Sequence, residues 1–529
     1  MSKELFARPD LEQYKRQAKE LLRGAKAGEP DALKRFQDSH PRGAQSLVSL
    51  KLHDAQWVLA REHGFPSWRA MRIQIAAVNA VTNVEAFLHA AVWGGSFEKA
   101  RDMLALRPAL SGADLYCACV TGEVDTVERL LAAEPQLALR KGGPKGWEPI
   151  LYLCFSNFLV AQSQRGQGER FVAIARRLLE LGADPNSAFI GDPQFGSARE
   201  TALYGASGIA NHAGLTELLL KAGADPQDGD PDNGGAETIY HTAEFQDLTC
   251  MRLLFEYGVS QRAKNYCLYR QLDFENIEGT RLFLENGANP NAGVHETLGS
   301  ILHHAILRGR STDVIRVLVE NGADINVPNG DGRTPFALAT RLGRMEAAAY
   351  LAGQGCDVRL SPEDRFIGAC AVADADGIAQ ALAEDKNLAS RLSQDDHKVL
   401  GLAARENRLE AAKAMLDAGL EITVNDGGLQ PLHWAAWFGH PEMVALLLKY
   451  GAPLEVPNRY GGTPLSTAVY ASRHCHEAAG VGGGGQTLSD REREANYVKV
   501  AEILIAAGAK VHPWMLGLGT AALEKVVAR

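Results

Sequence analysis

The chain has 529 residues, 46% of them hydrophobic and 22% charged, a composition typical of folded soluble proteins. No run of about 18 apolar residues occurs, and the start lacks the apolar core of a signal peptide, so we expect neither a membrane span nor secretion. Residues 1–75 carry 14 Lys and Arg against 9 Asp and Glu, whereas the remainder carries 41 against 55. A nucleic-acid site needs a concentrated basic face, so nucleic acid is a disfavoured partner and only the N-terminal segment could contact phosphate.

The eight cysteines are scattered singly, apart from Cys117-x-Cys119, and none forms a CxxC pair. This usage is typical of buried thiols in a reducing compartment and not of a disulfide framework. We therefore expect a cytoplasmic protein without a membrane segment.

Residues 1–80 are expected to form a small module of four helices. Asp10 is placed to cap the first helix, whose apolar residues recur at helical spacing. A short second helix is expected over 30–36, a third ends at Gly64, and a fourth begins near Trp68. We interpret the basic residues of this module as a solvated outer face.

Residues 81–529 show a different pattern, in which paired helices repeat. Nine copies of one phrase occur between residues 182 and 511: an apolar helix that ends in glycine, followed by a short polar tag. Gly287, Gly322 and Gly355 are 35 and 33 residues apart. A period in the low thirties indicates a stacked-repeat solenoid, and counting the pairs predicts about twelve units. Such an array favours binding over catalysis.

The clearest unit covers residues 428–452. It reads Pro-Leu-His-Trp-Ala-Ala at 431–436, then Gly-His at 439–440, then a leucine-rich helix. This unit resembles the ankyrin repeat almost position by position, and residues 332–336 and 462–465 repeat its opening.

The resemblance to ankyrin repeats covers roughly residues 84–511. It implies an all-α ankyrin-repeat solenoid, preceded here by the small helical module. The chain also resembles an uncharacterised bacterial family that joins such an array to a short N-terminal helical segment, through residues 55–65 and 146–152. That second resemblance implies a fold and leaves the activity open.

Aromatic residues gather at the variable positions of the last two clear units. Ankyrin arrays bind through loop tips and the exposed end of each first helix, and Tyr and Trp, like Arg, are enriched in binding hot spots. We therefore predict a non-catalytic scaffold whose acidic concave face binds a protein partner with basic or aromatic segments. The alternative is that these aromatics pack under the insertion that follows them. The expected contact residues are Trp437, Phe438, Arg459, Tyr460 and Tyr470.

Three insertions interrupt the repeat, near residues 158–168, 228–235 and 474–495. Long loops inside a compact array are usually functional or disordered, and these three could wall off part of the concave face. The third insertion opens with His474-Cys475-His476, which places three candidate metal ligands together. Because adjacent residues rarely converge on one ion, we assign no metal or cofactor to them.

Histidines occupy two neighbouring positions of the first helices. His303 and His433 fall where the ankyrin pattern places a structural histidine that bonds the backbone of a neighbouring loop. His241 and His304 fall one position later and are less easily explained. Beside a carboxylate such as Glu244 they suggest an alternative function, an enzyme or a small-ligand or metal-binding protein with a histidine-lined site. No residue is assigned a catalytic role.

Overall fold

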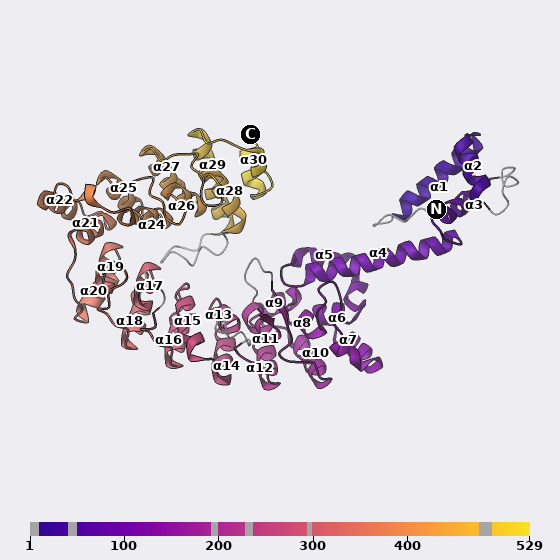
Figure 1. Cartoon of the computed structure of the whole chain (residues 1–529), viewed down its shortest axis with the longest axis horizontal. Helices are drawn as coiled ribbons and strands as arrows, with labels where there is room; N and C mark the ends of the chain where they lie inside the picture. Colours follow the sequence, from indigo (N-terminus) through magenta and orange to yellow (C-terminus); the bar gives the residue numbers. More distant parts are fainter. Residues whose placement is uncertain are drawn as a thin grey trace. The chain divides into compact units, whose positions relative to one another are not determined.

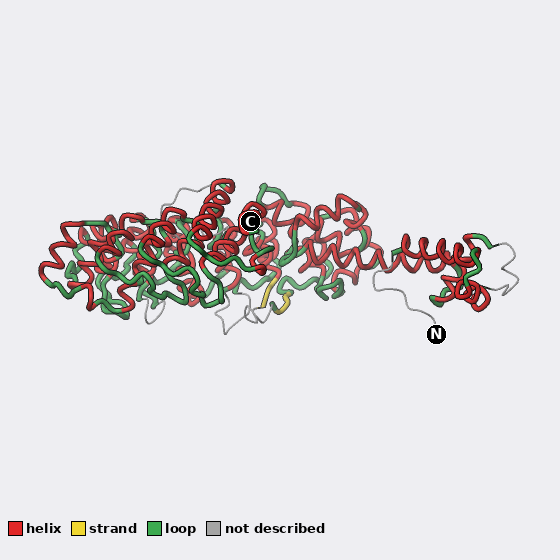
Figure 2. Tube along the Cα trace, turned by 90° about the horizontal axis from the view of Figure 1, so that it is seen from above, coloured by secondary structure: helices red, strands yellow, loops and turns green. Residues whose placement is uncertain are grey.

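The computed structural model describes most of the chain, which divides into two compact units, residues 1–228 and 229–529 (Figure 1). Helices dominate both units, and among the described residues the strands form one short hairpin (Figure 2). The side chains of residues 73, 76–83 and 490 are not described. The described ranges are 10–40, 50–191, 199–227, 236–293, 299–475 and 489–528.

The first unit opens with the four expected helices. Asp10 caps the first of them, because its Oδ1 accepts a hydrogen bond of 2.9 Å from the backbone N–H of Glu12. Ser67 caps the fourth in the same way through the N–H of Ala70. The helices are α1 (Leu11–Lys26), α2 (Pro30–Ser39), α3 (Leu52–Glu62) and α4 (Trp68–Ala91).

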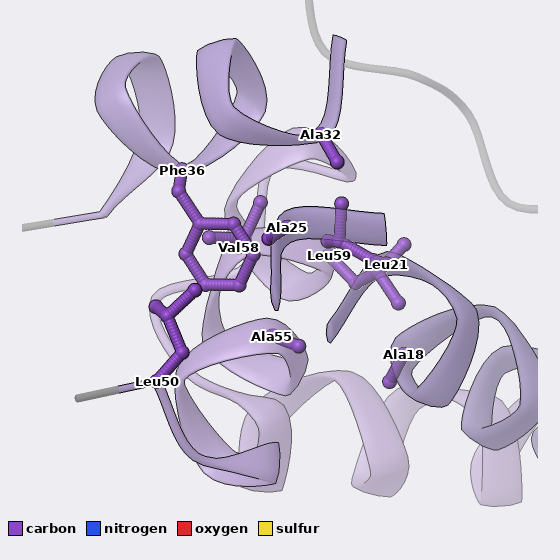
Figure 3. Packing of buried hydrophobic residues seen from close by; sticks show 9 residues of the cluster. All are labelled: Ala18, Leu21, Ala25, Ala32, Phe36, Leu50, Ala55, Val58 and Leu59. Atoms are coloured by element: carbon purple, nitrogen blue, oxygen red, sulfur yellow. The ribbon is translucent and has the colours of Figure 1, made fainter. Parts of the chain in front are cut away.

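A compact apolar core holds α1, α2 and α3 together (Figure 3). Phe36 of α2 is fully buried against Leu50 and Val58, and Leu21 of α1 packs on Leu59 of α3. A second cluster of Tyr14, Ala60, Met71 and Ile75 joins α4 to the same module.

Helix α4 continues without a break through residue 80, where the sequence suggested a boundary between module and array. Its last turns pack against α5 (Phe97–Leu106) as the first helix pair. The division into 1–80 and 81–529 stays a prediction.

The rest of the first unit contains three more helix pairs: α6 with α7, α8 with α10, and α11 with α12. Helix α9 falls in the insertion expected at 158–168, so much of that insertion is helical. A π-helical turn, η5, follows α11. The bounds are α6 (Leu115–Thr121), α7 (Val124–Ala133), α8 (Pro149–Cys154), α9 (Asn157–Ser163), α10 (Glu169–Glu180), α11 (Ala202–Tyr204), η5 (Gly205–Ile209) and α12 (Ala213–Lys221), with 3₁₀ turns η2 (Pro108–Gly112) and η3 (Pro135–Leu139).

A short hairpin is a departure from the all-helical expectation for this segment. Strands β1 (Ala188–Ile190) and β2 (Arg199–Thr201) pair antiparallel, with Phe189 opposite Glu200. Phe189 stacks on Trp147 at a centroid distance of 4.2 Å, which fixes the hairpin against the helices. The fold class is unchanged, because these six residues are the strands of the described chain.

The second unit contains eight consecutive helix pairs, so the described chain has twelve pairs in all, as the sequence predicts. The bounds are α13 (Glu237–Thr242), α14 (Thr249–Tyr257), α15 (Gln261–Gln271), α16 (Ile277–Glu285), α17 (Ile301–Leu307), α18 (Thr312–Glu320), α19 (Pro335–Arg341), α20 (Met345–Gly353), α21 (Pro362–Ala371), α22 (Ala375–Glu384), η6 (Ala389–Arg391), α23 (Gln394–His397), α24 (Val399–Arg405), α25 (Leu409–Asp417), α26 (Pro431–Trp437), α27 (Pro441–Lys449), α28 (Pro464–His474), α29 (Asp490–Ala506), η8 (Pro513–Met515) and α30 (Ala521–Val527).

Within this unit the pairs form two stacked layers. First helices such as α15, α17 and α19 contact one another on the inner side, and second helices such as α16, α18 and α20 contact one another on the outer side (Figure 1). No single pair could bury its leucine-rich helix alone, so the stack is the stable form.

The glycines of the repeated phrase do what the pattern predicts. After the last turn of each second helix the backbone turns left-handed, a conformation that glycine adopts without the steric cost of a Cβ atom. All nine have a φ between +81° and +102°: Gly182, Gly223, Gly258, Gly287, Gly322, Gly355, Gly419, Gly451 and Gly508.

Asparagines in some of the polar tags join one repeat to the next. Asn291 donates to the carbonyl of Gly322 at 2.8 Å and accepts from the N–H of Asp324 at 2.8 Å. Asn186 makes the same two contacts to Gly223 and Asp225. One amide thereby holds two consecutive turns at a fixed spacing.

Two of the three expected insertions fall partly or wholly outside the described residues. Residues 228–235 and 476–488 are not described. Helix α28 extends to His474, and α29 begins at Asp490, earlier than the sequence pattern indicated. Ser489 and Glu492 form a reciprocal capping box at that start, which explains the earlier boundary.

Candidate functional site

The last repeats contain a pocket of about 530 Å³ that we call the aromatic pocket. Trp437, Tyr460 and Tyr470, three of the five residues expected to contact a partner, line it together with Trp514 and Leu518. Tyr460 is 78% exposed, Trp514 52% and Tyr470 43%. Large aromatic side chains with this exposure on one concavity form an apolar surface that water covers in the free protein. The remaining lining residues are Asn458, Gly462, Ser466 and Thr467.

A tight turn presents Tyr460 to this pocket. The side-chain oxygen of Asn458 accepts hydrogen bonds of 2.9 Å from the N–H groups of Tyr460 and Gly462. The side-chain amide of Asn458 donates to Thr467 in α28 at 3.2 Å. Asn458 therefore ties the turn to the helix that carries Tyr470.

The rings of the pocket are arranged around the end of α26. Trp437, its last residue, lies with its ring centroid 6.1 Å from that of Tyr470. The carbonyl of Trp437 accepts a 2.7 Å hydrogen bond from the hydroxyl of Tyr497 in α29, which fixes the helix end. His474 stacks on the other side of Tyr470 at 4.2 Å.

The other two expected contact residues lie in different places. Arg459 is exposed and its guanidinium lies 4.8 Å from the ring centre of Tyr460, at the pocket rim. Phe438 does not line the pocket; its ring stacks near Trp434 and His440. The sequence pattern marked Phe438 as a variable position beside Trp437, yet one residue turns a helical side chain by about 100° to another face.

Trp514 and Leu518 are pocket residues that the sequence pattern missed. They follow α29, in and after the turn η8, where the repeat phrase has already ended at Gly508. The signal that could have found them is His-Pro-Trp at 512–514, an aromatic just beyond the last recognisable unit.

The second group of candidates forms an ion-pair cluster on the inner helices α13, α15 and α17. His241 Nδ1 lies 2.9 Å from Glu244 Oε1, the contact that the sequence left open, and its Nε2 lies 3.3 Å from Glu237. Arg270 donates to Glu244 at 2.6 Å and to Asp273 at 2.8 Å.

The ion-pair cluster continues to His304, so the structure brings His241 and His304 into one network. Arg308 donates from Nε to Asp273 at 2.7 Å, and Nε2 of His304 lies 3.5 Å from the same carboxylate. The ring of His304 packs on Tyr269 at 3.8 Å between centroids. Asp273 thus neutralises charges from two helices.

The protonation state of His241 in this cluster does not suit metal binding or base catalysis. Burial disfavours charge on His241, but its bonds to Glu237 and Glu244 prevail and raise its pKa to about 9. At neutral pH it is an imidazolium without a free lone pair. Burial opposes ionisation of Asp273, yet contacts with His304 and Arg308 hold the pKa of that carboxyl below its usual range. Each charge is matched inside the cluster.

The third group of candidates is not assembled into a site by the described residues. His474 stacks on Tyr470, and Cys475 lies by Tyr497, whose pKa is raised by burial and then by that thiol. His476 lies outside the described residues. Among the side chains that are described, no three His, Cys, Asp or Glu residues are grouped to hold a metal ion.

The two histidines expected to be structural bond neighbouring loops as predicted. His303 Nε2 lies 2.9 Å from the carbonyl of Arg333, and His433 Nε2 lies 3.0 Å from that of Val456. Each joins one repeat to the turn of the next.

The fold and these contacts agree with comparisons to known proteins. A family model described as ankyrin repeats matches in three copies, over residues 268–361, 367–458 and 400–479. The chain therefore contains ankyrin repeats, and its structure is an all-α repeat solenoid. No helix in the described ranges is both long and apolar enough to cross a membrane.

Curated relatives match part of the array. Ankyrin repeat and SOCS box protein 16 of Homo sapiens is 30% identical over 32% of this chain and 40% of its own length. An E3 ubiquitin-protein ligase of Arabidopsis thaliana is 30% identical over 34% of each chain. Neurogenic locus notch homolog protein 1 of Danio rerio is 30% identical over 29% of this chain and 7% of its own length. The chain thus spans well under half the length of these relatives.

Two solved structures are also similar in part. The ankyrin repeat domain of Bcl-3 is 25% identical, with a TM-score of 0.31, over 38% of this chain and 86% of that domain. The ankyrin repeat domain of human ASB11 is 21% identical, with a TM-score of 0.20, over 44% and 96% respectively.

Proposed function

We propose that this protein is a non-catalytic interaction scaffold that binds a partner protein through the aromatic pocket. The observation that carries the proposal is that four exposed or half-exposed aromatic side chains from four segments share one pocket. Trp and Tyr dominate binding hot spots because they bury large areas at low conformational cost. Ankyrin repeats generally mediate protein–protein interaction, which agrees with this assignment.

We place the contact surface on the concave side of the array, where first helices such as α26 and α28 lie. A standard interface buries about 1,600 Å² in total, which a few repeats can supply. We place the protein in the cytoplasm, because its cysteines are scattered and seven of the eight are buried. The resemblance to a bacterial family stays a prediction, since the relatives named above are eukaryotic.

The test is a pull-down from native lysate with the full-length chain and with the Trp437→Ala/Tyr460→Ala double variant. We expect the variant to recover the specific partner at least ten-fold less well, because two anchors of the hot spot are removed. Tyr257→Ala is the matched control, since Tyr257 is a 41% exposed tyrosine on an outer helix.

Thermal unfolding of each variant separates loss of binding from loss of fold. Equal recovery by the folded double variant would contradict the proposal. Zinc bound to the purified protein at a one-to-one ratio would instead favour the alternative of a metal-binding protein.

A further inference from the structure

We propose that the aromatic pocket accepts an uncharged aromatic or large aliphatic side chain whose neighbour in the partner is a carboxylate, paired with Arg459. The inference rests on the proposed function and deepens it, because it names the chemistry of the partner segment. It also differs from the expectation, based on the acidity of the whole array, that the partner is basic.

The size and lining of the pocket favour an apolar guest. Its volume of about 530 Å³ lies in the range of pockets that enclose small organic groups. Trp437, Tyr470 and Trp514 offer ring surfaces, and Leu518 adds an aliphatic one. No Asp or Glu is among the described residues that line it, so a cationic guest would find no counter-charge there.

The polar side chains of Asn458 and Ser466 in the pocket already have hydrogen-bond partners. Asn458 accepts from two backbone N–H groups and donates to Thr467, as described above. The hydroxyl of Ser466 donates to the carbonyl of Thr463 at 3.0 Å. A polar guest would lose its hydration and gain little from these two residues in return, which costs free energy. An apolar guest does not meet this cost.

The rim of the pocket is basic. Arg459 lies over Tyr460, and Arg473 donates to the carbonyl of Gly517 at 3.2 Å, one residue from Leu518. Both are exposed, and neither is ion-paired to any carboxylate of the described residues. Glu524, an acidic residue of the described chain, already accepts from the N–H of Gly517 at 3.0 Å. A carboxylate beside the apolar guest would therefore be attracted to the rim.

Three probes with the same ring and different charge test the inference: indole-3-propionate, indole and tryptamine. Binding to the full-length chain is measured by ligand-observed NMR at low salt. We expect indole-3-propionate to bind about two- to five-fold more tightly than indole, as for an exposed ion pair, and tryptamine to bind most weakly. At 0.5 M salt the differences should shrink, because the charges are screened.

Variants identify the residues responsible. Arg459→Gln should remove the preference for indole-3-propionate over indole, and Tyr460→Ala should weaken all three probes by about ten-fold. Arg316→Gln is the matched control, because Arg316 lies 4.8 Å over the ring of Tyr350 on outer helices, away from the pocket. It should leave all three affinities unchanged.

Two outcomes overturn the inference: tryptamine binds as tightly as indole-3-propionate, or no probe responds to Tyr460→Ala. Failure of the proposed function gives a different result. In that case the probes bind in the expected order and respond to Tyr460→Ala, while the pull-down shows no partner that depends on Trp437 and Tyr460.

Discussion

The aromatic pocket and the ion-pair cluster contain similar residue types but differ in whether those residues bind one another. Both involve inner helices of the second unit and the turns beside them, and both combine tyrosines with an arginine stacked on one of them: Arg459 on Tyr460 and Arg270 on Tyr240. In the cluster, Arg270 also binds Glu244 and Asp273, so its charge is matched within the chain. In the pocket, the aromatic rings and the arginine remain partly exposed to solvent.

This difference separates a structural site from a binding site. Charged groups that pair with one another stabilise the fold and have few hydrogen bonds left to offer a ligand. Exposed aromatic and cationic groups can still form favourable contacts when a ligand binds. Changes in the ion-pair cluster should therefore alter stability and spare binding of indole probes to the pocket. Replacements of Asp273, His241 and Gln271 should alter the free energy of unfolding, from the largest effect to the smallest.

Replacing Asp273 by alanine should give the largest loss of stability. Asp273 is 8% exposed and contacts Arg270, Arg308 and His304, so its removal leaves buried cationic groups without their carboxylate. We expect a loss of about 3–5 kcal/mol in urea unfolding. Binding of indole-3-propionate to the folded variant should match wild type; a parallel loss of binding would show that the two regions are coupled.

The pH dependence of stability should carry the signature of His241. Because the pKa of His241 is raised to about 9 in the folded chain, from 6.5, its stabilisation is complete below about pH 6.5 and is lost as pH rises through 9. The loss should be on the order of 3 kcal/mol. His241→Gln should flatten the unfolding free energy between pH 6.5 and 9.5, and an unchanged slope would contradict the assignment.

Gln271→Met should stabilise the protein slightly. Gln271 is fully buried beside Gly279, and neither its amide nitrogen nor its oxygen has a hydrogen-bond partner in the described residues. Removing this unpaired amide should add about 1 kcal/mol to the free energy of unfolding. Gln261→Met is the contrasting variant: Gln261 donates to the carbonyl of Gly287 at 2.7 Å, so its loss should not stabilise.

Much of the fold could be predicted from the sequence because its rules are local and repeated. The left-handed glycines and the cap at Asp10 depend on a few neighbouring residues, and the bonds of His303 and His433 to the next turn recur with the repeat. The hairpin of β1 and β2 could not be predicted in this way. Its anchor is the contact of Phe189 with Trp147, which lies about 40 residues earlier.

The candidate site could be predicted in part for the same reason. Trp437 and Tyr470 stand at equivalent positions of adjacent repeats, and Tyr460 lies in the turn before the second of them, so the repeat pattern places the three together. Trp514 comes from a segment without the period, and its approach depends on how α29 and η8 fold back. The protonation of His241 also depends on Glu237 and Glu244, whose geometry the spacing alone does not set.

The asparagines of the polar tags make the contacts between repeats sensitive to deamidation. Asn291 both donates to and accepts from the next repeat, and this requires an amide, because a carboxylate has no hydrogen to donate. Hydrolysis of the amide to aspartate would set a negative oxygen against the carbonyl of Gly322. Deamidation over time would therefore weaken the hydrogen bonds that set the spacing between repeats, one junction at a time, while the helices themselves stay intact.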